Sequence, residues 1–158
     1  MNLTPPQIHL LLNHVPVVGA AGVTLMLAVG VLRKREEIVR MALGFALLVA
    51  LITIPVYRTG EPAEQWIKKL PGVTESVIAP HESAANVAFA CMLLVGAISG
   101  FGLGAYRGKP LPGWMPITML TLMLAVSALM AVVAHRGGMI RHTEIRADAV
   151  PPEQGGEH

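Results

Sequence analysis

The chain has 158 residues, of which 53% are hydrophobic and only 14% charged. This composition is too apolar for an ordinary soluble domain and is typical of a chain that crosses a membrane. The formal charge of +2 gives no argument for nucleic-acid binding, and the single cysteine, Cys91, excludes an internal disulfide and a c-type haem attachment motif.

Four stretches are long and apolar enough to cross a bilayer, which takes about 20 predominantly apolar residues. They are residues 8–32, 38–57, 83–106 and 114–135. We therefore expect residues 1–143 to form one transmembrane domain, followed by a polar, disordered tail over 144–158. The predicted fold class is all-α, an integral membrane four-helix bundle with up-down-up-down topology. The first stretch is too long for a signal peptide and no basic residue precedes it, so we expect it to be retained.

The third stretch carries Gly96, Gly100 and Gly104 at four-residue intervals. This spacing places them on one face of a helix, where a neighbouring backbone can approach closely. We expect that face to pack inside the bundle.

The distribution of Arg and Lys predicts the orientation of the chain. Residues 33–40 (RKREEIVR) and 106–113 (YRGKPLPG) are short connections that are dense in basic residues. The segment 58–82 and the C-terminal tail also hold basic residues, but these are spread out and offset by acids. Short basic loops face the cytoplasm. Both termini are therefore expected on the non-cytoplasmic side.

Five of the six histidines fall at the ends of the helices on that same side: His9, His14, His81, His135 and His142. Histidines with unrelated structural roles would not need to share one end of a bundle. His9 and His14 are five residues apart, which rotates a helix by about 500°. Their side chains therefore point about 140° apart, and His14 lies about 7.5 Å further along the helix axis into the membrane.

Imidazoles at one end of a membrane bundle bind haem iron, bind another metal or relay protons. The sequence offers small residues after His81, as a haem slot requires. We predict that His14 and His81 are the axial ligands of a b-type haem, that His135 is the next candidate ligand and that His9 serves a second haem. The cations expected to pair with the haem carboxylates are Arg58 and Arg141, with Arg136 on the same side.

Two alternatives remain open at this stage. His14, His81 and His135 would also suit a copper or zinc site, because imidazole is a good ligand for both metals. The histidines would otherwise be structural or proton-linked, stabilising the segment 58–82 in a cofactor-free accessory protein of a larger complex. No nucleophile elbow, phosphate loop or dinucleotide fingerprint is present. We therefore expect a non-catalytic electron-transfer or accessory subunit in the lipid bilayer.

Several short motifs resemble a bacterial four-helix integral membrane family of unknown function, whose members begin near HPxxVHFPIAL. The stretch HLLLNHVPVV is similar to that opening at His9, His14 and Pro16. RTGEPA (58–63) looks like the Thr-Gly turn after the family's second helix.

Two later motifs extend this resemblance over nearly the whole chain. PHESAANVA (80–88) looks like the family's single histidine opening the third helix, and HRGGMIRHTEI (135–145) resembles its closing Gly-Gly segment. The sequence departs from the family at Leu10, where the family has proline, and at Val15, where it has an aromatic residue. It also has Ile140-Arg141-His142 in place of an aliphatic-Tyr pair. The resemblance implies the fold, the histidine set and the bacterial inner membrane, but no reaction. A place beside respiratory or other electron-transfer subunits, or a quinone, is the hypothesis that fits.

Overall fold

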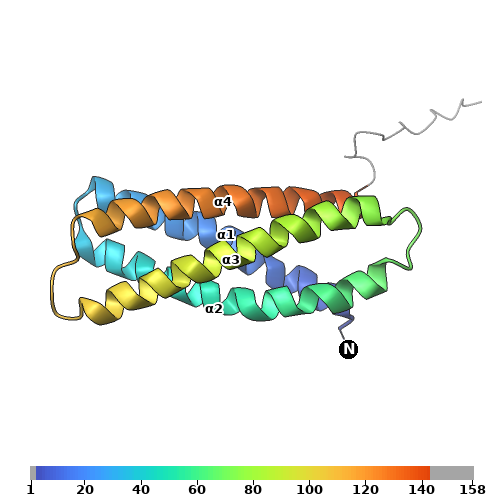
Figure 1. The fold of residues 1–158 in the computed structure, drawn as a ribbon, viewed down its shortest axis with the longest axis horizontal. Coiled ribbons are helices and arrows are strands. Elements are labelled where there is room, and N and C mark those ends of the chain that lie inside the picture. The colour runs from blue at the N-terminus through green and yellow to red at the C-terminus, as the bar shows by residue number, and fades with distance from the viewer. Residues whose placement is uncertain (1–2, 143–158) are drawn as a thin grey trace, which may run out of the picture.

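The computed structural model describes residues 3–142, in which the regular structure is helical. Its elements are α1 (Pro5–Leu32), α2 (Glu36–Ile67), α3 (Glu75–Ala105) and α4 (Trp114–Arg141). The four helices lie side by side along the long axis of the molecule (Figure 1). Contacts join α1 to α2 and α4, and α3 to α2 and α4, so α1 and α3 lie diagonally across the bundle. In Figure 1 the connections α1–α2 and α3–α4 share one end, and α2–α3 lies at the other.

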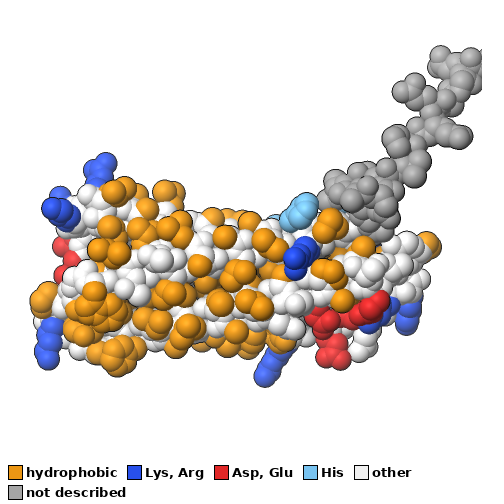
Figure 2. Space-filling model, turned by 45° about the horizontal axis from the view of Figure 1, so that its top comes forward, with side chains coloured by type: hydrophobic (Ala, Val, Ile, Leu, Met, Phe, Trp, Pro, Cys, Tyr) orange, Lys and Arg blue, Asp and Glu red, His pale blue; other side chains and the backbone are white. Residues whose placement is uncertain are grey.

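The helices confirm the all-α prediction, and each is long and apolar enough to cross a membrane, as a multi-pass chain requires. The helices contain 28 to 32 residues. At 1.5 Å per residue they span about 42 to 48 Å, whereas the hydrocarbon core of a bilayer is about 30 Å thick. The bundle is therefore longer than its membrane-embedded part. Hydrophobic side chains cover the middle of its surface, and charged side chains gather toward its ends (Figure 2).

The extra length changes the expected loop over residues 58–82. Most of that segment is helical, and only residues 68–74 connect α2 to α3. Apolar composition marks the part of a helix in lipid, but backbone hydrogen bonds continue into water where polar side chains support them. Lys68 provides such support, because its ammonium lies 2.6 Å from the Glu64 carboxylate and 3.2 Å from that of Glu75 across the connection.

A seven-residue repeat sets which side chains face the axis. Residues at this spacing are buried or half-buried in every helix. They are His9, Pro16, Val23 and Gly30 in α1; Val39, Ala46, Thr53 and Gly60 in α2; His81, Ala88, Val95 and Gly102 in α3; and Met123, Met130 and Gly137 in α4. A sustained repeat of seven is the pattern of helices that wrap around one another. The bundle core is therefore built in layers, with one residue from each helix at a given level.

Small residues let the helices approach closely within these layers. A Cβ added at Gly96 would collide with the Cβ of Ala50, so α2 and α3 touch there almost backbone to backbone. At Gly104, by contrast, an added Cβ would meet nothing within 4 Å. The expected packing face of α3 is thus confirmed at its first glycine and does not extend to its last.

Candidate functional site

The last layer of the repeat contains two histidines and two glycines, one from each helix: His9 (α1), Gly60 (α2), His81 (α3) and Gly137 (α4). We call this the His–Gly layer. A Cβ added at Gly60 would lie 3.7 Å from Cε1 of His9, and one added at Gly137 would lie 3.1 Å from Cε1 of His81. Each ring therefore packs against a glycine of a neighbouring helix, and the two rings face inward from diagonally opposite helices.

The His81 ring is fixed by a backbone carbonyl of α4. Its Nδ1 lies 3.1 Å from the carbonyl oxygen of Val133. A carbonyl only accepts hydrogen bonds, so Nδ1 must carry the proton. In the neutral ring, Nε2 then keeps its lone pair.

The His9 ring is held in the same way by α2. Its Nδ1 lies 3.0 Å from Oγ1 of Thr59. That hydroxyl already donates its single proton to the carbonyl of Val56, at 2.7 Å. Thr59 must therefore accept from His9, which places the proton on Nδ1 and leaves the Nε2 lone pair free.

Both rings thus present the same unused atom. The side-chain hydrogen bonds of these two rings within residues 3–142 all use Nδ1, and His9 is also within hydrogen-bond reach of the Val56 backbone carbonyl, which accepts from Thr59 as well. An Nδ1–H bonded to a carbonyl or hydroxyl, with Nε2 left over, is the arrangement that orients a metal-ligating histidine. The layer can therefore offer two imidazole nitrogens from opposite sides of the bundle axis.

The structure does not bring His14 together with His81. His14 lies on the exposed side of α1, where its Nδ1 bonds the carbonyl of Leu10 in its own helix at 2.7 Å. His135 is exposed on α4, and His142 is exposed just after it. Of the predicted ligands, the structure therefore brings together His9 and His81.

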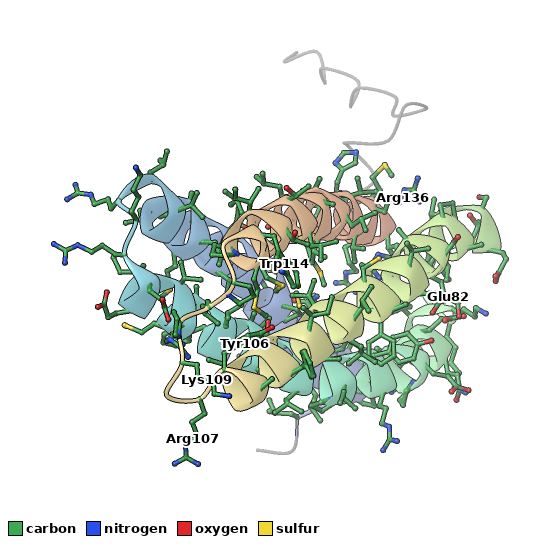
Figure 3. The ribbon with its side chains drawn as sticks, turned by 60° about the vertical axis from the view of Figure 1, so that its left-hand side comes forward. Glu82, Tyr106, Arg107, Lys109, Trp114 and Arg136 are labelled. Atoms are coloured by element: carbon green, nitrogen blue, oxygen red, sulfur yellow. The ribbon has the colours of Figure 1, made fainter. Side chains whose placement is uncertain are left out.

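The predicted cations lie at this end of the bundle but outside the layer. Arg58 and Arg141 are both exposed. Arg136 is half-buried and donates from Nη1 to the carbonyl of Pro80 at 2.8 Å, which ties α4 to α3. Figure 3 shows Arg136 on α4 and Glu82 on the neighbouring α3 at this end.

The depth of the layer follows from helix lengths. His9 is 23 residues from the end of α1 at Leu32, and His81 is 24 residues from the end of α3 at Ala105. Both histidines therefore lie about 35 Å from the opposite end of the bundle. This distance is similar to the roughly 30 Å thickness of the hydrocarbon core, so the layer lies in the part of the bundle near one edge of that core.

Thr59, Gly60 and the carbonyl of Val133 were not predicted as site residues. The Thr-Gly pair and the Gly-Gly pair containing Gly137 stand out in the sequence, but their spacing gives no role. The seven-residue repeat identifies the two glycines, because it places Gly60 and Gly137 in line with the buried residues of their helices. It gives no signal for Thr59 or Val133.

Among residues 3–142, no group of three or more His, Cys, Asp or Glu side chains is placed to hold a metal ion. Comparison with protein-family models, with curated proteins and with solved structures finds no match for the chain. The function must therefore be argued from the His–Gly layer and its surroundings.

Proposed function

We propose that the chain is a membrane-embedded electron-transfer subunit that binds a b-type haem between His9 and His81. The observation that carries the proposal is the shared state of the two rings. Each ring uses Nδ1 to bond a neighbouring helix and leaves the Nε2 lone pair free. When bound, such a haem accepts and donates single electrons.

The number of donors favours haem over a bare metal ion. Copper and zinc sites built from side chains usually need three or four protein ligands. The described part of the chain offers two facing nitrogens and no group of three. Haem brings four nitrogens of its own and needs only one or two axial ligands from the protein. The pair His9 and His81 thus replaces His14 and His81 in the proposal.

The remaining parts of the proposal concern charge and orientation. Arg58 and Arg141 are the cations we propose for the haem carboxylates, since both are exposed at the same end as the layer. We further propose an up-down-up-down bundle in a bacterial inner membrane. The short basic connections would face the cytoplasm, and the His–Gly layer and both termini would lie on the other side.

One observation also supports a second candidate, a cofactor-free accessory protein. The Nδ1 bonds of the two histidines join α1 to α2 and α3 to α4. Hydrogen bonds between membrane helices contribute to association, so the histidines would then be structural.

Asparagine substitutions separate the two candidates. The amide nitrogen of Asn can occupy the place of histidine Nδ1, so His81→Asn and His9→Asn retain a donor to the neighbouring helix but lack Nε2. We expect the purified wild-type protein, expressed with ample haem supply, to show Soret and α bands in a reduced-minus-oxidised spectrum. Both Asn variants should lose these bands and remain folded.

The exposed histidines provide matched controls, because His14→Asn and His135→Asn remove imidazoles outside the layer. Both control variants should retain the bands. A colourless wild-type protein would exclude haem binding and leave the accessory role. Bands that survive in His9→Asn and His81→Asn would show that the iron is held elsewhere.

A further inference from the structure

The end of the bundle opposite the His–Gly layer carries a second feature, independent of haem. The connections α1–α2 and α3–α4 lie there together (Figure 1). Five exposed cations project from them: Arg33, Lys34, Arg35, Arg107 and Lys109. Figure 2 shows Lys and Arg side chains gathered at this end. We call these five residues the basic platform.

An internal clamp holds the two connections in a fixed relation. Arg40, at the start of α2, donates to the Glu36 carboxylate at 2.8 Å, to the carbonyl of Tyr106 at 3.1 Å and to the carbonyl of Lys109. The same Glu36 carboxylate accepts from the backbone N–H of Leu111 at 3.2 Å. Segments about 70 residues apart are thereby joined, and the charges of Arg40 and Glu36 neutralise each other.

The platform itself is not neutralised. None of its five cations forms an ion pair within residues 3–142. The segments 33–40 and 106–113 contain one other acid, Glu37, which is exposed and likewise forms no ion pair in the described part of the chain. Five free positive charges thus face one free negative charge on a rigid support.

Aromatic side chains fix the level of the platform relative to lipid. Tyr106 and Trp114 flank the α3–α4 connection in the chain, and Figure 3 shows Arg107 and Lys109 at the same end of the bundle as these two aromatics. Trp114 is 60% exposed. An exposed Trp at a helix end lies at the headgroup level of a bilayer, so Trp114 places the platform cations near the level of the lipid phosphates.

We propose that the basic platform is a binding surface for the phosphate headgroups of anionic phospholipids. Clusters of Lys and Arg beside membrane helices attract anionic lipids, and a headgroup that pairs with one such cation is favoured about fivefold. The clamp distinguishes the platform from a flexible basic tail, because it presents cations from two connections at once. The platform therefore enriches anionic lipid around the helix ends at this end of the bundle.

Tryptophan quenching tests this proposal in vesicles. The Trp66→Phe protein retains Trp114 as its single tryptophan, beside the platform. It is reconstituted into phosphatidylcholine containing a minor fraction of phosphatidylglycerol with brominated chains, which quench on contact. We expect Trp114 to be quenched as if the anionic lipid were enriched about fivefold over its mole fraction, and the excess to fall as salt is added. The second reporter is Leu11→Trp in a protein without the native tryptophans, and it lies at the opposite end of the bundle in place of a 67% exposed side chain. Its quenching should match the mole fraction of the anionic lipid, without excess.

Charge variants provide the matched comparison. Arg107→Gln together with Lys109→Gln should reduce the excess quenching of Trp114 several-fold, while the clamp survives because it uses the backbone carbonyl of Lys109. Lys69→Gln removes an exposed charge from the other end and should leave the excess unchanged. Three results would overturn the proposal. Trp114 could be quenched in low salt only as the mole fraction of anionic lipid predicts, both reporters could show the same excess, or the excess could persist in the variant Arg107→Gln with Lys109→Gln.

Discussion

The two glycines of the His–Gly layer differ in one respect that can be measured. A Cβ at Gly60 would lie at an ordinary contact distance, 3.7 Å, from the His9 ring. A Cβ at Gly137 would lie 3.1 Å from Cε1 and 3.3 Å from Nδ1 of His81, so that ring must move by a few tenths of an ångström. The movement strains the bond from His81 Nδ1 to the Val133 carbonyl, which is 3.1 Å long. Gly60→Ala and Gly137→Ala are therefore a matched pair.

Their expected free energies of unfolding follow from two terms. Replacing Gly by Ala within a helix stabilises it by about 1 kcal/mol. Weakening a partly buried hydrogen bond costs about 1 to 3 kcal/mol. Gly60→Ala should gain the first term alone, whereas Gly137→Ala should be about 2 kcal/mol less stable than Gly60→Ala.

Unfolding in mild detergent, followed by circular dichroism, measures this difference. Nitrogen-15 shifts of the His81 ring report whether Nδ1 keeps its proton, which we expect in the wild type and in Gly60→Ala. In the double variant His81→Ala/Gly137→Ala the penalty should vanish, because the ring is gone. If Gly137→Ala is as stable as Gly60→Ala, the packing of His81 on α4 is refuted.

Three further predictions concern other parts of the bundle. Thr24→Val removes a hydroxyl that contacts Oγ of Ser127 in α4 at 2.8 Å, and it should lower the free energy of unfolding by about 1 kcal/mol. The control Thr121→Val removes a hydroxyl that bonds its own helix and should change this free energy little. Equal losses in the two variants would contradict the interhelical role of Thr24. Lys34 has a φ of +51°, so Lys34→Gly should relieve about 1 kcal/mol of backbone strain. This variant should have a higher midpoint of thermal unfolding than the wild type, and a lower midpoint would argue against the strain. The Glu64 carboxylate raises the pKa of Lys68 by accepting a hydrogen bond, so this contribution to stability is present at lower pH and is lost as pH rises through the raised pKa. The difference in the midpoint of thermal unfolding between the wild type and Lys68→Gln should therefore shrink at high pH. A difference that grows with pH would contradict a stabilising role for the charge of Lys68.

The sequence predicted the helical fold for a physical reason that holds locally. Four apolar stretches of sufficient length can satisfy their backbone hydrogen bonds in lipid only as helices, so their number and order followed from composition. The end of the bundle at which the histidines lie followed as well, because His9 and His81 are near the starts of their helices.

The helix ends were less predictable. Composition changes at residue 58, where α2 would leave the lipid, but the helix continues to Ile67. Its last turns depend on side-chain pairs such as Glu64 with Lys68, and on the pairing of Lys68 with Glu75 after the chain has turned back. Contacts between two helices decide where the connection begins, and such contacts are not visible in the hydropathy of either helix alone.

Which of His9 and His14 faces the bundle axis depends on the rotation of α1 about its own axis. The angle between the two side chains does not determine that rotation. An angle of about 140° between two side chains means that both cannot face inward, but it does not say which one does. An absolute phase comes from residues that must be buried. Positions 16, 23 and 30 of α1 are all buried and repeat every seven residues, and one further step of seven reaches His9. The same step from Ala88 reaches His81. His9 and His81 therefore share a layer because both continue the core repeat. His14 lies deeper along α1, but its ring is on the exposed face and so does not reach this layer.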